Sequence, residues 1–257
     1  FEIIERAKTN CRSLKDERLS LAKEDRKGVV IHMLEPIAEA WENFRLSRVP
    51  PVYSFADMIT KFLTEGTVPP LDVLIVDEAQ DLAELNWQLV DMLASHADKT
   101  FIAGDDDQAI YEWNGARPQR FINYRGKHVV LDQSFRIPSL VHPIAERISQ
   151  RIISREPKSY KPRKEKGTVS NVASVELLPL QKGNWLVLAS CDYMLTDASK
   201  GYNVRKYLID NGYPFIHNNY RYIPRKMMSA ITVWKKLNNE EEITLGELDD
   251  LYNYLGK

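Results

Sequence analysis

Two short apolar runs, each followed by a group of polar side chains, constrain the fold of this chain more than any other feature. The run from Val73 to Val76 ends in Asp77 and Glu78, and the run from Thr100 to Ala103 leads through a glycine into Asp105-Asp106-Asp107-Gln108. Such runs predict strands that are buried on both faces of a sheet. Because ligands of open α/β sheets bind at the carboxyl ends of the strands, we expect both polar tips to lie on one edge.

The charge of this region is strongly one-sided. Between Leu71 and Glu112 there are eleven Asp and Glu residues against a single Lys99. Crowded carboxylates raise each other's pKa unless a cation lies among them, and Mg²⁺ prefers oxygen ligands. The sequence therefore predicts a Mg²⁺ site at Asp77 and Glu78, with an ordinary turn at the end of the strand as the alternative.

Three motifs in this order carry a resemblance to a known family. The segment Leu74–Asp81 resembles the Walker B motif of the UvrD/Rep-type superfamily 1 DNA helicases, and Gly104–Ala116 is similar to their third motif. Leu131–Arg136 is similar to the fourth motif. Later segments at 185–189 and 211–215 resemble the second lobe of such helicases, and their sequence is similar to that of phage-encoded members.

The resemblance implies ATP and Mg²⁺ as cofactors and assigns roles to five residues. Asp77 would hold Mg²⁺ beside Glu78, which would accept a proton from the water that attacks the terminal phosphate. Gln80 and Gln108 would contact that water or the γ-phosphate. Arg136 would stabilise charge on the transferred phosphoryl group. For Arg136 the alternative is a surface arginine paired with an acidic neighbour.

The resemblance also implies single-stranded DNA and its junctions with duplex as partners. Tyr111 and Trp113 resemble the platform on which unpaired bases stack. The alternative for both rings is packing in the core. Asn114 stands where many relatives carry an arginine that reaches a DNA phosphate, which puts that backbone contact in doubt.

Composition excludes several other classes of protein. The 257 residues are 44% hydrophobic and 28% charged, as is ordinary for a globular protein. There is no apolar run near 18 residues and no signal peptide, so we expect no membrane partner and a cytoplasmic location in a bacterial or phage-infected cell. The two cysteines, Cys11 and Cys191, have neither a CxxC spacing nor a nearby histidine cluster, which argues against a zinc site.

Positive charge is concentrated in the second half of the chain, although the net charge is only −1. Residues 151–166 hold seven Lys and Arg against two acids, and residues 200–226 hold six against one. Basic patches of this kind can follow a phosphate backbone. For residues 151–167, which include two prolines, we predict a basic linker.

The predicted fold class is α/β, with portions of two RecA-like P-loop NTPase lobes and a helical subdomain at the start. The helical subdomain spans residues 1–68, the carboxyl part of the first lobe 69–126, and a partial second lobe 127–257. Further predictions are a helix over 84–95, a short helix over 118–123, a strand over 128–131, a helix capped by Ser139 that runs to about 153, strands over 168–173, 185–189 and 214–217, a helix over 196–210 stopped by Gly212, and final helices over 225–237 and 245–255.

Two features that bear on the function are absent from the sequence. No GxxxxGK[ST] loop occurs, and no segment resembles the fifth or sixth helicase motif. We therefore expect an internal fragment of a 3′ to 5′ DNA helicase of repair or replication, which alone hydrolyses ATP poorly. One rival is a Mg²⁺-dependent nuclease built on Asp77, Glu78 and residues 105–107. The other is a non-catalytic fragment that binds nucleic acid or a partner protein.

Overall fold

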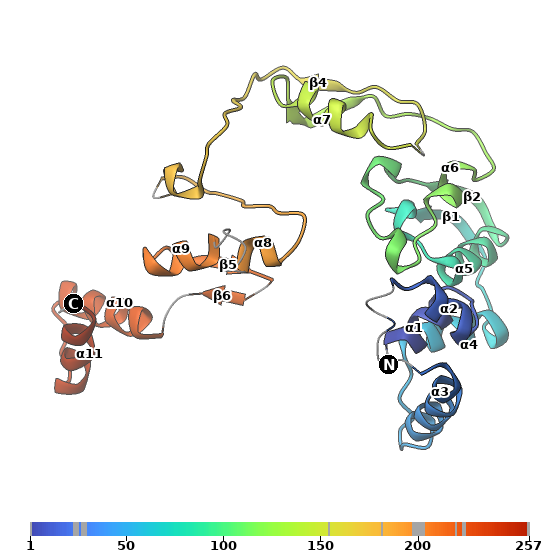
Figure 1. Cartoon of the computed structure of the whole chain (residues 1–257), viewed down its shortest axis with the longest axis horizontal. Coiled ribbons are helices and arrows are strands. Elements are labelled where there is room, and N and C mark those ends of the chain that lie inside the picture. Colours follow the sequence, from blue (N-terminus) through green and yellow to red (C-terminus); the bar gives the residue numbers. More distant parts are fainter. Residues whose placement is uncertain are drawn as a thin grey trace. The chain divides into compact units, whose positions relative to one another are not determined.

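The chain forms two compact units, residues 1–169 and residues 170–257. Figure 1 shows a computed structural model of the whole chain, coloured along the sequence. The structure describes residues 2–22, 26, 30–153, 155–180, 182–196, 204–218, 220–222 and 225–255. Its strands are short and include two parallel pairs, so the molecule is a mixed α/β protein as predicted. No helix among the described residues is long and apolar enough to cross a membrane.

The first unit begins with helices, as the sequence predicts. They are α1 (Glu2–Thr9), α2 (Leu14–Ser20), α3 (Ile31–Leu46) and α4 (Phe55–Glu65). Ser13 caps α2 by accepting a hydrogen bond from the Asp16 backbone N–H, and Ser54 and Asp57 form a reciprocal capping box at the start of α4. Contacts of α1 with α2, α4 and the later helix α5 (Glu84–Ala94) join this helical region to the sheet.

Ion pairs connect α1, α3 and α4. Lys8 Nζ lies 2.5 Å from Glu42 Oε1 and 2.7 Å from Asp57 Oδ1, and Arg45 Nη1 lies 2.7 Å from Asp57 Oδ2. Burial works against the charged carboxylate, but hydrogen bonds from Arg45 and Lys8 outweigh it and hold the pKa of Asp57 well below its usual range. The pairs fix the three helices because each acid contacts cations from two elements.

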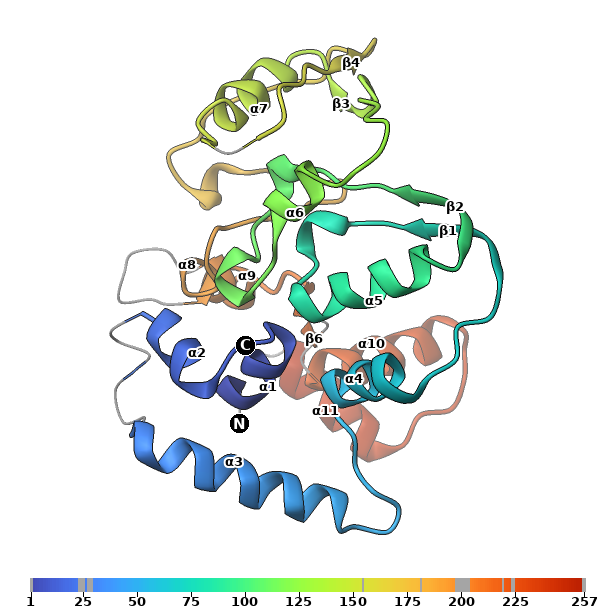
Figure 2. The same cartoon turned by 90° about the vertical axis from the view of Figure 1, so that its right-hand side faces the viewer.

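The two predicted motif strands are present and adjacent. Strand β1 (Leu71–Val76) pairs in parallel with β2 (Ala97–Ile102), and helix α5 (Glu84–Ala94) makes the crossover between them (Figure 2). Trp87 is fully buried under the sheet in a core with Ala79 and Val90, and its ring stacks on Tyr124 at 5.4 Å between centroids. The predicted helix over 84–95 is therefore confirmed.

The prediction that these strands are buried on both faces is wrong for the described part of the chain. Residues alternate between covered and open positions along β1 and β2, and Ile75 is 71% exposed while Phe101 is 57% exposed. Val76 and Ile102, which point the other way, pack against the core beneath α5. The apolar run thus predicted the strand correctly, but only one of its faces is covered here.

The rest of the first unit contains two 3₁₀ turns, followed by two short helices and two short strands. The turns are η2 (Asp106–Gln108) and η3 (Glu112–Asn114), and the elements are α6 (Pro118–Ile122), β3 (Gln133–Pro138), α7 (His142–Ser149) and β4 (Lys161–Arg163). The short helix predicted over 118–123 is confirmed by α6. Strand β3 pairs in parallel with β4, with an irregular register.

Two predictions in this region are wrong. Residues 128–131 are not a strand, because the pairing with β4 begins only at Gln133. Ser139 does not cap a helix: its hydroxyl donates to the Glu165 carbonyl oxygen at 3.4 Å, and α7 starts at His142 after Val141 without a side-chain cap. Helix α7 also ends at Ser149, which is earlier than the predicted 153.

The second unit contains small elements and one helical hairpin. They are η4 (Val175–Leu177), α8 (Tyr193–Thr196), α9 (Val204–Asp210), β5 (Phe215–His217), β6 (Tyr220–Tyr222), α10 (Arg225–Asn238) and α11 (Leu245–Leu255). Strands β5 and β6 form an antiparallel pair, and α10 packs on α11 through Ala230, Val233 and Leu251. The final two helices are therefore confirmed.

Two strands predicted near the start of this region are absent from the part of the chain that the structure describes. Residues 168–173 and 185–189 form no strand, because neither segment has a ladder partner among the described residues. The helix predicted over 196–210 is present as α9, whereas residues 197–203 lie outside the described part. Gly212 has a φ of +70° just after α9, which confirms it as a helix stop.

Candidate functional site

The polar ends of β1 and β2 meet at one edge of the sheet, as the sequence predicts. The Ala103 N–H donates to the Val76 carbonyl at 2.8 Å, and the Ala79 N–H donates to the Ala103 carbonyl at 3.0 Å. The backbone pairing therefore continues past both strands and brings the segment after Val76 against the segment after Ala103.

Asp77 and Glu78 are both exposed at the end of β1. The Glu78 N–H donates to Asp77 Oδ1 at 2.9 Å, and Glu78 has a left-handed backbone with φ of +53° and ψ of +38°. A residue other than glycine in this conformation costs on the order of 1–3 kcal/mol and persists only where the surroundings enforce it. The two hard oxygen donors, adjacent and open to solvent, fit the ligand chemistry of Mg²⁺.

Gln80 joins the two motifs. Its side chain is 1% exposed, its Nε2 donates to Glu78 Oε2 at 2.7 Å, and its Oε1 accepts from the Asp105 N–H at 2.9 Å. Gly104 permits this approach, because a Cβ there would lie 2.5 Å from Gln80 Oε1. The amide thus fixes the carboxylate of Glu78 relative to the acidic turn, which we define as residues 105–107.

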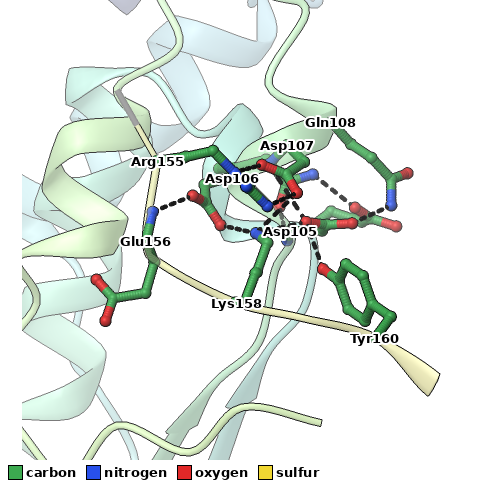
Figure 3. Close-up of polar contacts among 10 residues, drawn as sticks. Asp105, Asp106, Asp107, Gln108, Arg155, Glu156, Lys158 and Tyr160 are labelled. Atoms are coloured by element: carbon green, nitrogen blue, oxygen red, sulfur yellow. Dashed lines mark hydrogen bonds and ion pairs between the residues drawn. The ribbon is translucent and has the colours of Figure 1, made fainter. Parts of the chain in front are cut away.

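Two cationic side chains from residues 155–158 pair with the carboxylates of the acidic turn (Figure 3). Lys158 Nζ lies 2.8 Å from Asp105 Oδ1 and also contacts Asp106, while Arg155 makes two hydrogen bonds of 2.7 Å to the carboxylate of Asp107. Burial opposes the ammonium, yet hydrogen bonds to Asp105 and Asp106 raise the pKa of Lys158. Burial likewise opposes the carboxylate of Asp105, whose pKa is lowered by hydrogen bonds from Lys158 and Gln108.

Sequence reasoning missed these cations because it treated 151–167 as a linker. The segment instead contributes β4, and Tyr160 Oη adds a hydrogen bond of 3.2 Å to Asp105. The excess of carboxylates between Leu71 and Glu112 was the available signal, since it required counter-charges from elsewhere in the chain.

The acidic turn also has the geometry of a cation site. One oxygen from each of Asp105, Asp106 and Asp107 lies within 4.8 Å of the others. The ammonium of Lys158 and the guanidinium of Arg155 already neutralise these oxygens. The rival nuclease reading, which needs these three carboxylates for Mg²⁺, loses support from this pairing.

Gln108 is exposed and held by the acidic turn. Its Nε2 donates to Asp105 Oδ2 at 2.6 Å (Figure 3). Glu78, Gln80, Asp105 and Gln108 are therefore connected by hydrogen bonds, with the Asp105 backbone N–H as the link to Gln80.

The two aromatic rings after the acidic turn are open to solvent. Tyr111 is 45% exposed and Trp113 is 64% exposed, which does not match core packing within the described residues. The Arg6 guanidinium lies 6.0 Å from the centre of the Trp113 ring and donates to the Trp113 carbonyl at 2.6 Å. Asn114 is exposed at the end of the same 3₁₀ turn. Helix α1 thus anchors the turn while its rings stay accessible.

Arg136 lies exposed in β3. Its side chain makes no ion pair or hydrogen bond with the part of the chain that the structure describes, so the alternative of a surface pair with an acidic neighbour finds no support there. The structure does not bring Arg136 into contact with Glu78 or Gln108 among these residues.

Comparison with known proteins agrees with the arrangement of the motifs. Residues 7–128, which contain the end of α1, the β1–α5–β2 unit and both aromatic rings, match the UvrD/REP helicase N-terminal domain. This segment belongs to the UvrD/Rep helicase family. The match therefore runs from the end of α1 through the helical region and both motif strands.

Similar proteins carry helicase names. The chain is 28% identical over 149 residues to a probable DNA helicase II homolog of Mycoplasma capricolum, covering 56% of this chain and 18% of that protein. It is 24% identical over 186 residues to DNA helicase II of Haemophilus influenzae, covering 66% and 26%, and 45% identical over 49 residues to the ATP-dependent DNA helicase Rep of Escherichia coli, covering 19% and 7%. Each match thus spans about a quarter of the relative's length or less.

Proposed function

We propose that this chain is part of an ATP-dependent DNA helicase that couples Mg-ATP hydrolysis to movement along single-stranded DNA and to unwinding of duplex at junctions. The UvrD/Rep match over residues 7–128 supports the class of enzyme. The observation that carries the proposal is the bridge made by Gln80 between Glu78 and Asp105, because it joins the hydrolytic carboxylate to the motif that holds the exposed rings.

In this proposal the exposed carboxylate of Glu78 accepts the proton of the attacking water. Gln80 orients that carboxylate, and Gln108 contacts the water or the γ-phosphate. Mg²⁺, held by Asp77 with Glu78 beside it, would neutralise charge on the phosphates. Arg136 supplies the cation that stabilises the transferred phosphoryl group when two RecA-like lobes close on ATP.

The DNA side of the proposal rests on the rings. Tyr111 and Trp113 offer open faces to unpaired bases, and Asn114 lies beside them. Movement of the turn that follows Gln108 would transmit the state of the nucleotide to these rings. By family resemblance we propose 3′ to 5′ stepping, in repair or replication, in the cytoplasm.

The chain alone is proposed to hydrolyse ATP poorly. It holds no GxxxxGK[ST] loop, whose backbone amides and lysine cradle phosphates in enzymes of this class. A chain that had kept the fold but lost this chemistry would bind DNA without any response to nucleotide, which is the second candidate.

The test is steady-state ATP hydrolysis by the complete gene product, with and without single-stranded DNA. We expect DNA to stimulate turnover, and Glu78→Gln to lower kcat by roughly 100-fold or more, since general-base catalysis contributes about 10²–10⁴-fold. Glu65→Gln, at an exposed carboxylate that pairs with Lys61 on the surface, is the matched control and should leave turnover unchanged. Turnover that survives Glu78→Gln, or an intact protein without turnover that still binds DNA, would reject the helicase proposal.

A further inference from the structure

Lys158 lies in the segment 151–167 that the sequence predicts to be a linker, yet its side chain is buried. The side chain of Lys158 is 6% exposed, with its Nζ 2.8 Å from Asp105 Oδ1 and 3.6 Å from Asp107 Oδ2, and in contact with Asp106. A buried ammonium is costly unless it is paired and hydrogen-bonded. Its position therefore depends on the acidic turn, and the three carboxylates of the turn depend on it.

Asp105 also contacts the side-chain amides of Gln108 and Gln80. Its Oδ1 accepts from Lys158, its Oδ2 accepts from Gln108 Nε2 at 2.6 Å, and its backbone N–H donates to Gln80 Oε1 at 2.9 Å. Gln80 in turn donates to Glu78 Oε2 at 2.7 Å. Asp105 thus links Lys158 directly to Gln108 through its carboxylate, and links it to Gln80 and Glu78 through its own backbone N–H.

We propose that Lys158 is a positioning residue for ATP hydrolysis, because it fixes the carboxylate of Asp105, which holds Gln108, and so also holds in place the Asp105 backbone N–H that donates to Gln80, the partner of Glu78. The inference rests on the proposed function. Without the ammonium, Asp105 would face two neighbouring carboxylates with one less counter-charge, and it would turn away from Gln108.

Arg155 and Lys158 have different tasks in this scheme. Arg155 contacts Asp107, whose carboxylate makes no hydrogen bond to Gln80 or Gln108, so it docks the segment without reaching the amides. Lys161, three residues after Lys158, pairs with Asp132 on the surface. The segment therefore offers a matched control lysine.

The first test measures kcat and KM for ATP in the complete gene product. We expect Lys158→Met to lower kcat on the order of 10- to 100-fold, since small misplacements of catalytic groups have effects of that size, with KM changed less than about twofold. Lys158→Arg, which keeps the charge, should recover part of kcat, and Lys161→Met should match the unchanged protein. A kcat for Lys158→Met within about twofold of the unchanged protein would overturn the inference.

The second test does not depend on activity and uses this 257-residue chain. Side-chain amide resonances of Gln80 and Gln108, followed by ¹⁵N–¹H correlation spectra, should move in Lys158→Met and stay in place in Lys161→Met. If the intact protein shows no ATP turnover, the proposed function fails while these spectra still decide the positioning role. Resonances of both glutamines that ignore Lys158→Met would refute it.

Discussion

An added methyl group at Gly115 should strain the turn that holds the two aromatic rings. It follows η3 with φ of +104°, and a Cβ there would lie 1.7 Å from Asn10 Oδ1. Asn10 has little freedom to withdraw, because it is buried and its Nδ2 donates to Glu17 Oε2 at 3.0 Å, while Glu17 also accepts from Arg6 at 2.9 Å. Gly115→Ala should therefore strain the backbone and displace Asn10 together.

The size of the effect follows from these two causes. An alanine held at this positive φ costs about 1–3 kcal/mol. Forcing a methyl group into an occupied space costs about 1–3 kcal/mol more. The sum is about 2–6 kcal/mol, and in a domain of this size each kcal/mol lowers Tm by about 2–4 °C. We expect Gly115→Ala to lower the Tm of the first unit by roughly 4–24 °C.

Differential scanning calorimetry of the chain measures this change, and Gly126→Ala is its control. Gly126 has φ of +141° but no atom within 4 Å of an added Cβ, so its substitution carries the backbone cost alone. Gly115→Ala should also cost less when Asn10→Ala is already present. Equal losses of Tm at Gly115 and Gly126, or no benefit from Asn10→Ala, would refute the reasoning from the contact.

Two further predictions concern the rings and the second unit. Trp113→Ala should weaken single-stranded DNA binding by the complete gene product by about 1–3 kcal/mol without changing its salt dependence, because stacking is lost and phosphate contacts are kept; anisotropy titrations with oligo(dT) at several salt concentrations measure both, and unchanged affinity would contradict the stacking role. In the α10–α11 hairpin, hydrogen bonds from Lys236 and from the Thr244 backbone lower the pKa of Glu247 to about 2. Its stabilising effect is therefore present above the unfolded pKa of about 4.3 and is lost as pH falls toward 2; helicity followed by circular dichroism over this range should fall less steeply in Glu247→Gln, and identical profiles would contradict the assignment.

Local patterns predicted the motif strands and the helix between them. The apolar run before Asp77 and the spacing of Trp87 and Val90 in α5 are set within a few residues, so they are visible in the sequence. The meeting of Asp77 and Asp105 at one edge followed from the rule for parallel strands. The roles assigned to Glu78, Gln108 and Arg136 came from family resemblance and stay predictions.

Pairing between distant segments was not predictable in the same way. The segment 128–131 holds two valines and a leucine, as strands often do, yet the ladder starts at Gln133, because its partner at 161–163 fixes the register. Lys158 lies 53 residues from Asp105, so no local pattern links them. The excess of carboxylates between Leu71 and Glu112 indicated that cations from elsewhere must pair with them, but it did not indicate which lysine would do so.

The left-handed backbone of Glu78 sets activity against stability at one residue. Asparagine and glycine tolerate φ of +53° better than glutamate, so replacing Glu78 by either should relax the turn while it removes the carboxylate. A library of variants selected only for thermal resistance would therefore enrich proteins that have lost the proposed base. Selection at this position must include turnover, because the residue that the fold prefers is not the residue that the proposed chemistry requires.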